Sequence, residues 1–536
     1  MGHATLIRAL CHVAAALPIV VVAAVQGARG WTPLVDDAAI AWRSWDVFSL
    51  HSPLVGHMTE AKVNGLAYGL GPLQNWILAL PVRLSPDQGA LWGAAIACVV
   101  ASSLAIEAAW SMGRWTGAVV ASAAVSILVM TRPDLIADLV WNPTMGIFWL
   151  MTTVACGCAV AAGRLGWWPV TVLSASISAQ CHEFYAIPTL AICLVSVAAG
   201  LAARRSRGER LGGRWWIPAG LVSAVCWLPP LVQQVTGRPG NLGLLLHAAR
   251  GSSHLGLGTG LGGMGAAVRP FPDWLHIPWR GNPHFQWILE SFQGPKAWAV
   301  VVFALLVVIA VSAWRPESRL SALALVALAT DVGTVVSVAL FPTGIGNVNA
   351  FSYLDVAWWP VGIATWVTLL WAAVCLARSL IERRGRHRWW IRSRGPLQVC
   401  GGALVLGLAA AATWTNVPLV GGSVWGGWSM MRTTRQAAAA VERVAPRRPF
   451  TLAVVGGPSS FPDSLMVPFG LESGVAYRLH VRGLQPRFTT LGWHYFGAWT
   501  RQAPNEPVVT IELSRTVPTR VLGISVTPRG SRVAGT

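Results

Sequence analysis

Charged side chains are scarce in this chain and account for 11% of its 536 residues. Lysine is almost absent, so the formal net charge of +19 comes almost entirely from arginine. No nucleic-acid-binding motif accompanies this charge, and we expect no nucleic-acid partner. The nine cysteines include no CxxC pair, and eight of them lie in or beside apolar stretches. We therefore expect neither a disulfide framework nor a cysteine-based metal site.

Apolar residues, by contrast, make up 54% of the chain and gather in long runs. A run of about 20 such residues can cross the hydrocarbon core of a bilayer as a helix. Eleven apolar spans are predicted, near residues 5–27, 88–111, 116–131, 144–162, 167–181, 187–203, 215–233, 297–313, 320–341, 356–377 and 397–414. The composition therefore predicts an α-helical polytopic membrane protein.

The arginines gather in alternate connectors between these spans, and the most basic connectors are 204–214 and 378–394. Positively charged connectors stay on the cytoplasmic side of a membrane. We therefore expect a multi-pass plasma-membrane protein with a cytoplasmic N-terminus. The first loop, 28–87, the long loop, 234–296, and everything after Trp414 are then outside.

The sequence changes character after Trp414. We expect a transmembrane domain over 1–414 and a small extracytoplasmic α/β domain over 415–536. Short strands are predicted around a helix-like segment at 462–474, namely at 451–455, 475–481 and 507–513. From Val417 onward the chain has thirteen arginines and five acidic residues, which suits a position near anionic lipid or an acidic envelope polymer.

The first loop carries two adjacent carboxylates, Asp36 and Asp37, within ten residues of a membrane boundary. Adjacent carboxylates repel one another and resist burial. One interpretation is that they cap an interfacial helix over 38–48, because an aspartate suits the exposed amides and the dipole of a helix N-terminus. One aspartate would satisfy that need, so the alternative is that at least one of the two is catalytic. A second interfacial helix is predicted over 72–84.

Two further external connectors hold ionisable side chains. Asp134 and Asp138 are four residues apart, which places them on one face of a helix. They form an incomplete set of metal ligands, and solvated or helix-capping acids are the alternative. His182 and Glu183 follow the fifth span, where the histidine could donate to a phosphate or coordinate a metal. The alternative for His182 is an interfacial side chain bonded to water.

A glycine-rich segment at 256–263, GLGTGLGG, contains a literal GxGxxG. No strand pattern precedes it and no helix pattern follows it, so a dinucleotide site is not expected. The composition predicts a flexible loop.

Several short motifs follow one another in a set order along the predicted outer side. In these motifs and their order, the chain resembles the membrane-embedded glycosyltransferases of the GT-C superfamily. The likeness is greatest to an actinobacterial group related to arabinofuranosyl- and mannosyltransferases, and it covers roughly residues 5 to 360. The motifs are the aspartates after the first span, Pro53-Leu54-Val55-Gly56, Gly71-Pro72-Leu73, Trp141-Asn142-Pro143, Gln180-x-His182, Trp227-x-Pro229-Pro230 and Pro239-Gly240-Asn241. The loop helix departs from the family pattern, because it begins with Leu70-Gly71-Pro72 and its aromatic residue is delayed to Trp76.

This resemblance implies an extracytoplasmic active site, a polyprenyl-phosphate-linked sugar donor and an inverting hexosyl or pentosyl transfer. The acceptor is then a glycan, lipid or protein of the cell envelope. Transfer to a hydroxyl needs a base, and Asp36 or Asp37 suits that role. The leaving phosphate needs cations or hydrogen-bond donors, for which His182 and Arg132 come first, with Arg43 and Arg83 next. Asp134, Asp138 and Glu183 are candidates for a second acidic group, and participation of a divalent metal ion stays open.

Two other functions fit parts of the sequence. A transporter or lipid-linked-sugar flippase would explain the spans but would favour ionisable residues inside them, where Glu107 and Asp331 are the clearest. A non-catalytic envelope scaffold would place binding in the C-terminal domain and make Asp36 and Asp37 dispensable.

Overall fold

The computed structural model describes most of the chain. The residues outside this description are 1–2, 63–65, 210–212, 252, 273–292, 315–317, 343–356, 384–393, 418–426, 458–462, 489–495, 497, 504–505, 516, 518–519 and 528–536.

Each of the eleven predicted spans is a helix in the structure. These helices are α1 (His3–Ala28), α4 (Gly89–Gly113), α5 (Trp115–Thr131), α7 (Asn142–Ala161), α8 (Trp168–Cys181), α9 (Ala186–Ser206), α10 (Trp216–Thr236), α14 (Lys296–Ser312), α15 (Ser318–Ala339), α17 (Trp358–Arg383) and α19 (Arg394–Asn416). Eight of the described helices are long and apolar enough to cross a bilayer, whereas α5, α8 and α14 have 17, 14 and 17 residues. The chain is a helical, multi-spanning membrane protein, as the composition predicts.

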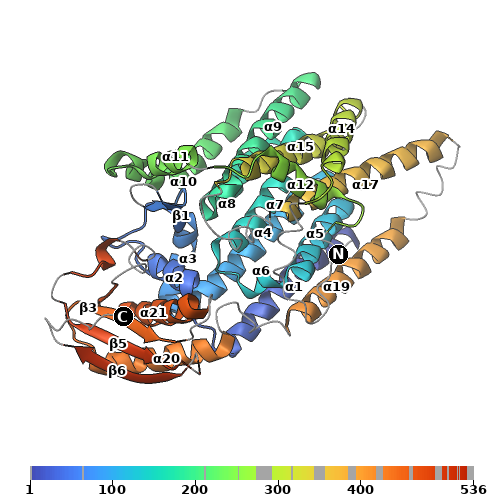
Figure 1. Cartoon of the computed structure of the whole chain (residues 1–536). Helices are drawn as coiled ribbons and strands as arrows, with labels where there is room; N and C mark the ends of the chain where they lie inside the picture. Colours follow the sequence, from blue (N-terminus) through green and yellow to red (C-terminus); the bar gives the residue numbers. More distant parts are fainter. Residues whose placement is uncertain are drawn as a thin grey trace.

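Helix α7 lies at the centre of the bundle, where it contacts α4, α8, α9 and α15 (Figure 1). Small and hydroxyl-bearing residues let these helices approach closely and hydrogen-bond across their interfaces. The hydroxyl of Thr152 donates to the carbonyl of Ala101 at 2.8 Å, and that of Thr153 donates to Ser174 at 3.0 Å. These two bonds tie α4 and α8 to α7.

The first external loop folds into two helices and a hairpin. Helix α2 (Val35–Trp45) begins three residues before the predicted start, and α3 (Leu73–Leu84) matches the prediction. Between them, β1 (Met58–Lys62) pairs antiparallel with β2 (Leu66–Tyr68). Helices α2 and α3 pack on each other, and α3 packs on α4 and α8.

The glycine-rich segment is not a flexible loop, and that prediction is wrong. It forms α12 (Leu257–Val268), which follows α11 (Asn241–Gly251) along the chain. Its glycines let the neighbouring helices α15 and α17 approach closely. A Cβ added at Gly260 would meet the carbonyl of Val335 at 2.6 Å, and one at Gly263 would overlap the ring of Trp358. Close packing against α15 and α17 therefore outweighs the low helix propensity of glycine.

After α19 the chain forms a separate α/β unit. It contains α20 (Gly427–Val444), β3 (Phe450–Gly456), α21 (Asp463–Val481), β4 (Pro486–Arg487), β5 (Val508–Leu513) and β6 (Val521–Thr527). The sheet order is β4-β3-β5-β6, with β3 parallel to β4 and β5, and β6 antiparallel to β5. Figure 1 shows this unit beside α2 and α3, at the end of the bundle opposite the N-terminus.

Strands β3 and β5 confirm two of the three predicted strands. The third, at 475–481, is wrong because these residues continue α21. Leu471, Val475, Ala476 and Leu479 are all buried, and this spacing is that of one face of a helix. The remaining short elements are α6 (Pro133–Ala137), η1 (Leu165–Trp167), η2 (Glu183–Tyr185), η3 (Gly213–Trp215) and η7 (Ala498–Thr500).

Candidate active site

Asp36 and Asp37 lie in the first turn of α2, but neither of them is its N-cap residue. The N-cap residue is Leu34, and it makes no side-chain capping bond. Asp36 instead accepts a hydrogen bond from the indole Nε1 of Trp141 at 3.1 Å, and its other oxygen lies 3.3 Å from Nε2 of His57. Asp36 therefore joins α2 to the connector before α7 and to the turn before β1.

Asp37 meets a second carboxyl group, that of Asp138. A side-chain hydrogen bond links the two, which requires a proton between them. Burial, the charges of Asp138 and Asp36, and this hydrogen bond together raise the pKa of Asp37 well above its ordinary value. The structure thus brings together two of the acids that the sequence singles out on different connectors. Asp134 belongs to α6, and its side chain lies outside the described residues.

His182 lies between α8 and η2 and is buried. Its Nδ1 accepts a hydrogen bond from the backbone N–H of Phe184 at 3.2 Å, so the neutral ring carries its proton on Nε2. Burial lowers the pKa of His182; the charge of Glu183 opposes this effect and the nearby His57 adds to it. The two histidines are thus close enough to interact, and His182 is a neutral hydrogen-bond donor beside the first loop.

Arg132 follows α5, and its guanidinium lies 5.6 Å from the ring centroid of Trp359. Tyr185 is near both Arg132 and His182: its ring centroid is 5.9 Å from that of His182, and it experiences the charge of Arg132. The hydroxyl of Tyr185 donates to the carbonyl of Pro143 at 3.1 Å. The two leading phosphate candidates therefore share one neighbour.

Arg43 and Arg83 hold backbone carbonyls of the first loop. Arg43 is buried and donates to Gly56 at 2.6 Å and to Val55 at 2.9 Å. Arg83 donates to the carbonyls of Trp45 and Val47, at 2.8 and 2.6 Å. Their present contacts shape the loop, whereas a role toward phosphate stays a prediction.

The remaining sequence motifs tie the first loop to the bundle. Gln180 accepts from the N–H of Leu73 at 3.4 Å and donates to the carbonyl of Cys226 at 2.8 Å. Gly71 is required at its position, because an added Cβ would overlap the amide of Gln180 and lie 2.8 Å from Pro230. Asn241 binds both the N–H and the C=O of Tyr68, each at 2.8 Å. Segments far apart in the sequence thus converge on the loop that carries the aspartates.

Sequence reasoning missed the role of His57 and of the Trp141 indole as partners of Asp36. A signal was present for both, since His57 directly follows the Pro53–Gly56 turn and Trp141 opens a quoted motif. Their contacts depend on the packing of α2 against the connector before α7, which the sequence does not show. In the part of the chain that the structure describes, no group of three or more His, Cys, Asp or Glu side chains could share a metal ion. The sequence left metal participation open, and this stays so.

Comparison with known proteins gives matches among solved structures, including the following two. One is apo ArnT from Cupriavidus metallidurans, with 14% sequence identity, a TM-score of 0.49, and coverage of 95% of this chain and 96% of that one. The other is the apo oligosaccharyltransferase of Archaeoglobus fulgidus, with 12% identity, a TM-score of 0.39, and coverage of 87% and 64%. No protein-family model and no curated protein matches. A function for this chain therefore has to come from the residues of its own site.

Proposed function

We propose that this protein transfers a sugar from a polyprenyl-phosphate-linked donor to a hydroxyl of a cell-envelope acceptor, at the outer face of the membrane and with inversion. The acceptor is a glycan, lipid or protein. The observation that carries the proposal is the half-buried pair of Asp37, on the first loop, and Asp138, on the connector before α7, next to a bundle of membrane-spanning helices. The resemblance of the sequence motifs to GT-C glycosyltransferases supports the same reaction.

Asp37 is the base in this proposal. The acceptor oxygen attacks the anomeric carbon, its proton passes to the Asp37 carboxylate, and the bond from the anomeric carbon to the phosphate oxygen breaks. The polyprenyl phosphate leaves with the bonding electrons. A carboxylate of raised pKa accepts a proton more effectively near neutral pH than an ordinary one. Asp37 must be ionised for this step, so the reaction runs above its raised pKa, where the shared proton has left and both carboxylates are charged.

Asp36 orients the base. Its two oxygens are already engaged by Trp141 and His57, which fixes the head of α2 against the bundle. The side chains of consecutive helical residues point about 100° apart. Asp36 can therefore contact Trp141 and His57 while Asp37 contacts Asp138.

In this proposal, the phosphate of the donor binds beside His182 and Arg132. The neutral His182 ring carries its proton on Nε2, and Arg132 supplies positive charge near the shared neighbour Tyr185. A charged donor and a hydrogen-bond donor aimed at a phosphate stabilise the charge that develops as the sugar departs. Arg43 and Arg83 come next in this proposal, in the order that the sequence gives, and their guanidinium groups donate to backbone carbonyls of the first loop.

A transporter or flippase finds less support among the described residues. Inside the spans, Glu107 is bonded to Arg8 and His12, and Asp331 accepts from Thr365 at 2.9 Å. Each acid is thus satisfied by its immediate neighbours. A proton relay would need a chain of such groups across the bundle.

Separate Asp37→Asn and Asp36→Asn variants test the proposal. Amide replacement keeps the size of the side chain and removes its basicity, so Asp37→Asn should lower the rate of sugar transfer by about 10²–10⁴. Asp36→Asn keeps an acceptor for Trp141 and should cost about tenfold or less. The assay measures turnover of a polyprenyl-phosphate sugar by the purified full chain, after equal membrane expression has been verified. Near-normal turnover of Asp37→Asn would refute its role as the base.

A further inference from the structure

Helix α21 of the C-terminal unit packs against the turn that precedes Asp36. Gly470, Ser473 and Gly474 share one face of α21, since they are three and four residues apart. The hydroxyl of Ser473 accepts from the buried N–H of Val35 at 2.8 Å and donates to the carbonyl of Gly470 at 3.1 Å. A Cβ added at Gly474 would lie 2.8 Å from the side chain of Leu34 and 3.0 Å from the carbonyl of Pro33. The absence of a side chain at Gly474 therefore lets the two backbones meet.

Val35 has a backbone conformation that needs such support. Its φ is +49°, in the left-handed region, which is strongly disfavoured for a β-branched residue. Strained conformations persist only where the surrounding structure over-determines them. Val35 is the first residue of α2 and directly precedes Asp36. Its conformation therefore sets the direction in which α2 and both carboxylates leave the turn.

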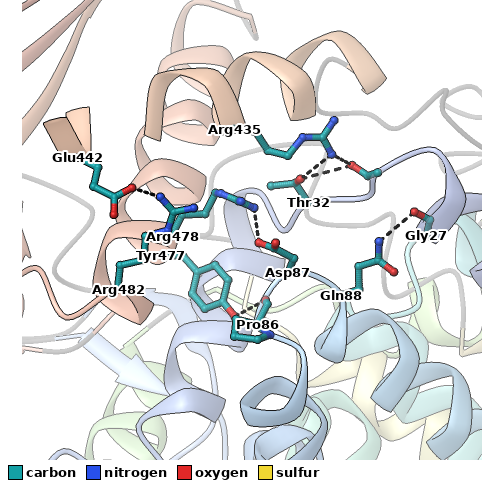
Figure 2. Close-up of polar contacts among 11 residues, drawn as sticks. Gly27, Thr32, Pro86, Asp87, Gln88, Arg435, Glu442, Tyr477, Arg478 and Arg482 are labelled. Carbon is teal, nitrogen blue, oxygen red and sulfur yellow. Dashed lines mark hydrogen bonds and ion pairs between the residues drawn. The ribbon is translucent and has the colours of Figure 1, made fainter. Parts of the chain in front are cut away.

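The same side of α21 reaches two more points of the first loop. The hydroxyl of Tyr477 donates to the carbonyl of Pro86 at 2.7 Å, and Arg478 pairs with Asp87 at 2.5 Å. Figure 2 shows these contacts beside that of Arg435, from α20, with Thr32.

One turn further along α21, the His480 ring stacks on that of Trp42, with centroids 4.0 Å apart, and its Nε2 lies 2.8 Å from the Asp46 carboxylate. Trp42 belongs to the last turns of α2, and Asp46 is its C-cap residue. One helix of the C-terminal unit thus holds both ends of α2 and the end of the loop.

We propose that α21 positions the first-loop aspartates, and that Ser473 is a positioning residue that fixes the Val35 turn at the head of α2. The inference rests on the proposed function, because it assigns to Ser473 an effect on the carboxylate that accepts the proton. Ser473 acts through Val35 and does not touch the substrate.

The test compares Ser473→Ala with Ser473→Thr in the full chain. Alanine removes the acceptor of the Val35 N–H, and a misplaced reacting group costs one to two orders of magnitude, so kcat should fall by about 10-fold to 100-fold. The KM for the polyprenyl-phosphate sugar should stay within about twofold, because the phosphate contacts are elsewhere. A displaced Asp37 is better solvated, so its pKa falls and the acidic limb of the pH–rate profile moves to lower pH. Threonine keeps the acceptor and should restore most of kcat.

Ser525→Ala provides the matched control. It makes the same chemical change at an exposed position on β6, and should leave kcat and the pH profile unchanged. Wild-type kcat and an unmoved acidic limb in Ser473→Ala would overturn the inference. So would an equal loss in Ser473→Thr, since the hydroxyl would then have no special role.

A second pair of variants does not depend on the hydroxyl. Gly474→Ala should push α21 away from Pro33 and Leu34 and lower kcat, whereas Gly470→Ala makes an ordinary 3.5 Å contact with Val35 and should be tolerated. Equal kcat in these two variants would contradict the inference. Asp37→Asn separates the two levels: if it is active, the proposed function fails. If it is inactive while Ser473→Ala and Gly474→Ala are normal, only the positioning role fails.

Discussion

Replacing Asp138 by asparagine should move the acidic limb of the pH–rate profile of sugar transfer to lower pH, because Asp138 raises the pKa of its partner Asp37. Asp138 raises the pKa of Asp37 both through its charge and through the shared hydrogen bond. A base of raised pKa is protonated, and therefore idle, below that pKa, so the rate rises as the pH passes through it. Asparagine removes the charge and offers an N–H to the ionised Asp37. The pKa of Asp37 then falls, and the acidic limb of the profile moves to lower pH.

The size of the shift follows from the charge that is removed. Two unit charges about 4 Å apart interact by about 4 kcal/mol at an effective dielectric constant of about 20, which corresponds to about three pKa units. Asp37 is only partly shielded from solvent, so solvent weakens this repulsion and we expect the acidic limb to move by less than this full amount. Burial and the Asp36 charge remain, and they keep the pKa of Asp37 above its ordinary value.

The assay is kcat/KM for the polyprenyl-phosphate sugar, measured between about pH 4.5 and 8.5, because this ratio reports ionisations of the free enzyme. Asp331→Asn is the matched control, since it makes the same change at a buried carboxyl of α15. Its acidic limb should coincide with that of the wild type. An acidic limb that stays in place in Asp138→Asn, or that moves to higher pH, would refute the coupling of the two carboxyls in the working enzyme.

Three further predictions concern the donor, the C-terminal unit and the topology. His182→Ala and Arg132→Ala should each raise the KM for the donor by about tenfold or more, because each removes a partner of the phosphate. Steady-state kinetics measure this KM, with Ser525→Ala as the control. An unchanged KM in both variants would mean that the phosphate binds elsewhere. Burial raises the pKa of Glu472 to about 8, so the folded state binds this proton more tightly than the unfolded state, and stability is lost as the pH rises from about 4.5 to about 8. Glu472→Gln should therefore raise the thermal midpoint at pH 8.5 more than at pH 5, by the equivalent of a few kcal/mol at most, and an equal effect at both pH values would contradict this. An impermeant thiol reagent on intact cells should label Ser525→Cys and not Ser206→Cys in a cysteine-depleted background; the reverse pattern would invert the proposed topology.

The membrane-spanning helices could be predicted from the sequence because burial in lipid requires long apolar runs. Every predicted span is a helix, with ends displaced by a few residues where polar connectors begin. The loop helices followed from the same patterning. The errors occurred where packing decides the outcome: α12 is helical because its glycines admit Val335 and Trp358. Residues 475–481 are helical because their buried face continues that of α21.

Site residues could be proposed from the sequence, but their partners could not. Asp36, Asp37, Asp138 and His182 stood out as ionisable groups at membrane boundaries. Which of them meet depends on how α2 packs against the connectors before α7 and after α8, and no local pattern encodes that. The hydrogen bonds of α21 with the first loop join residues between 391 and 438 positions apart, as in the Tyr477–Pro86 and Val35–Ser473 pairs. Such contacts cannot be predicted from hydrophobic periodicity or from short motifs.

The adjacency of Asp36 and Asp37 was the most puzzling feature of the sequence, and the helix resolves it. If both carboxylates faced one solvent-exposed capping position, their repulsion would weaken the start of α2. In the structure the helical turn directs them to different partners. Asp36 accepts a hydrogen bond from Trp141 and lies 3.3 Å from His57, whereas Asp37 faces an acid that opposes its ionisation. One residue is thereby held as an anchor and its neighbour is held as a base of raised pKa, so two identical side chains acquire opposite electrostatic environments one position apart.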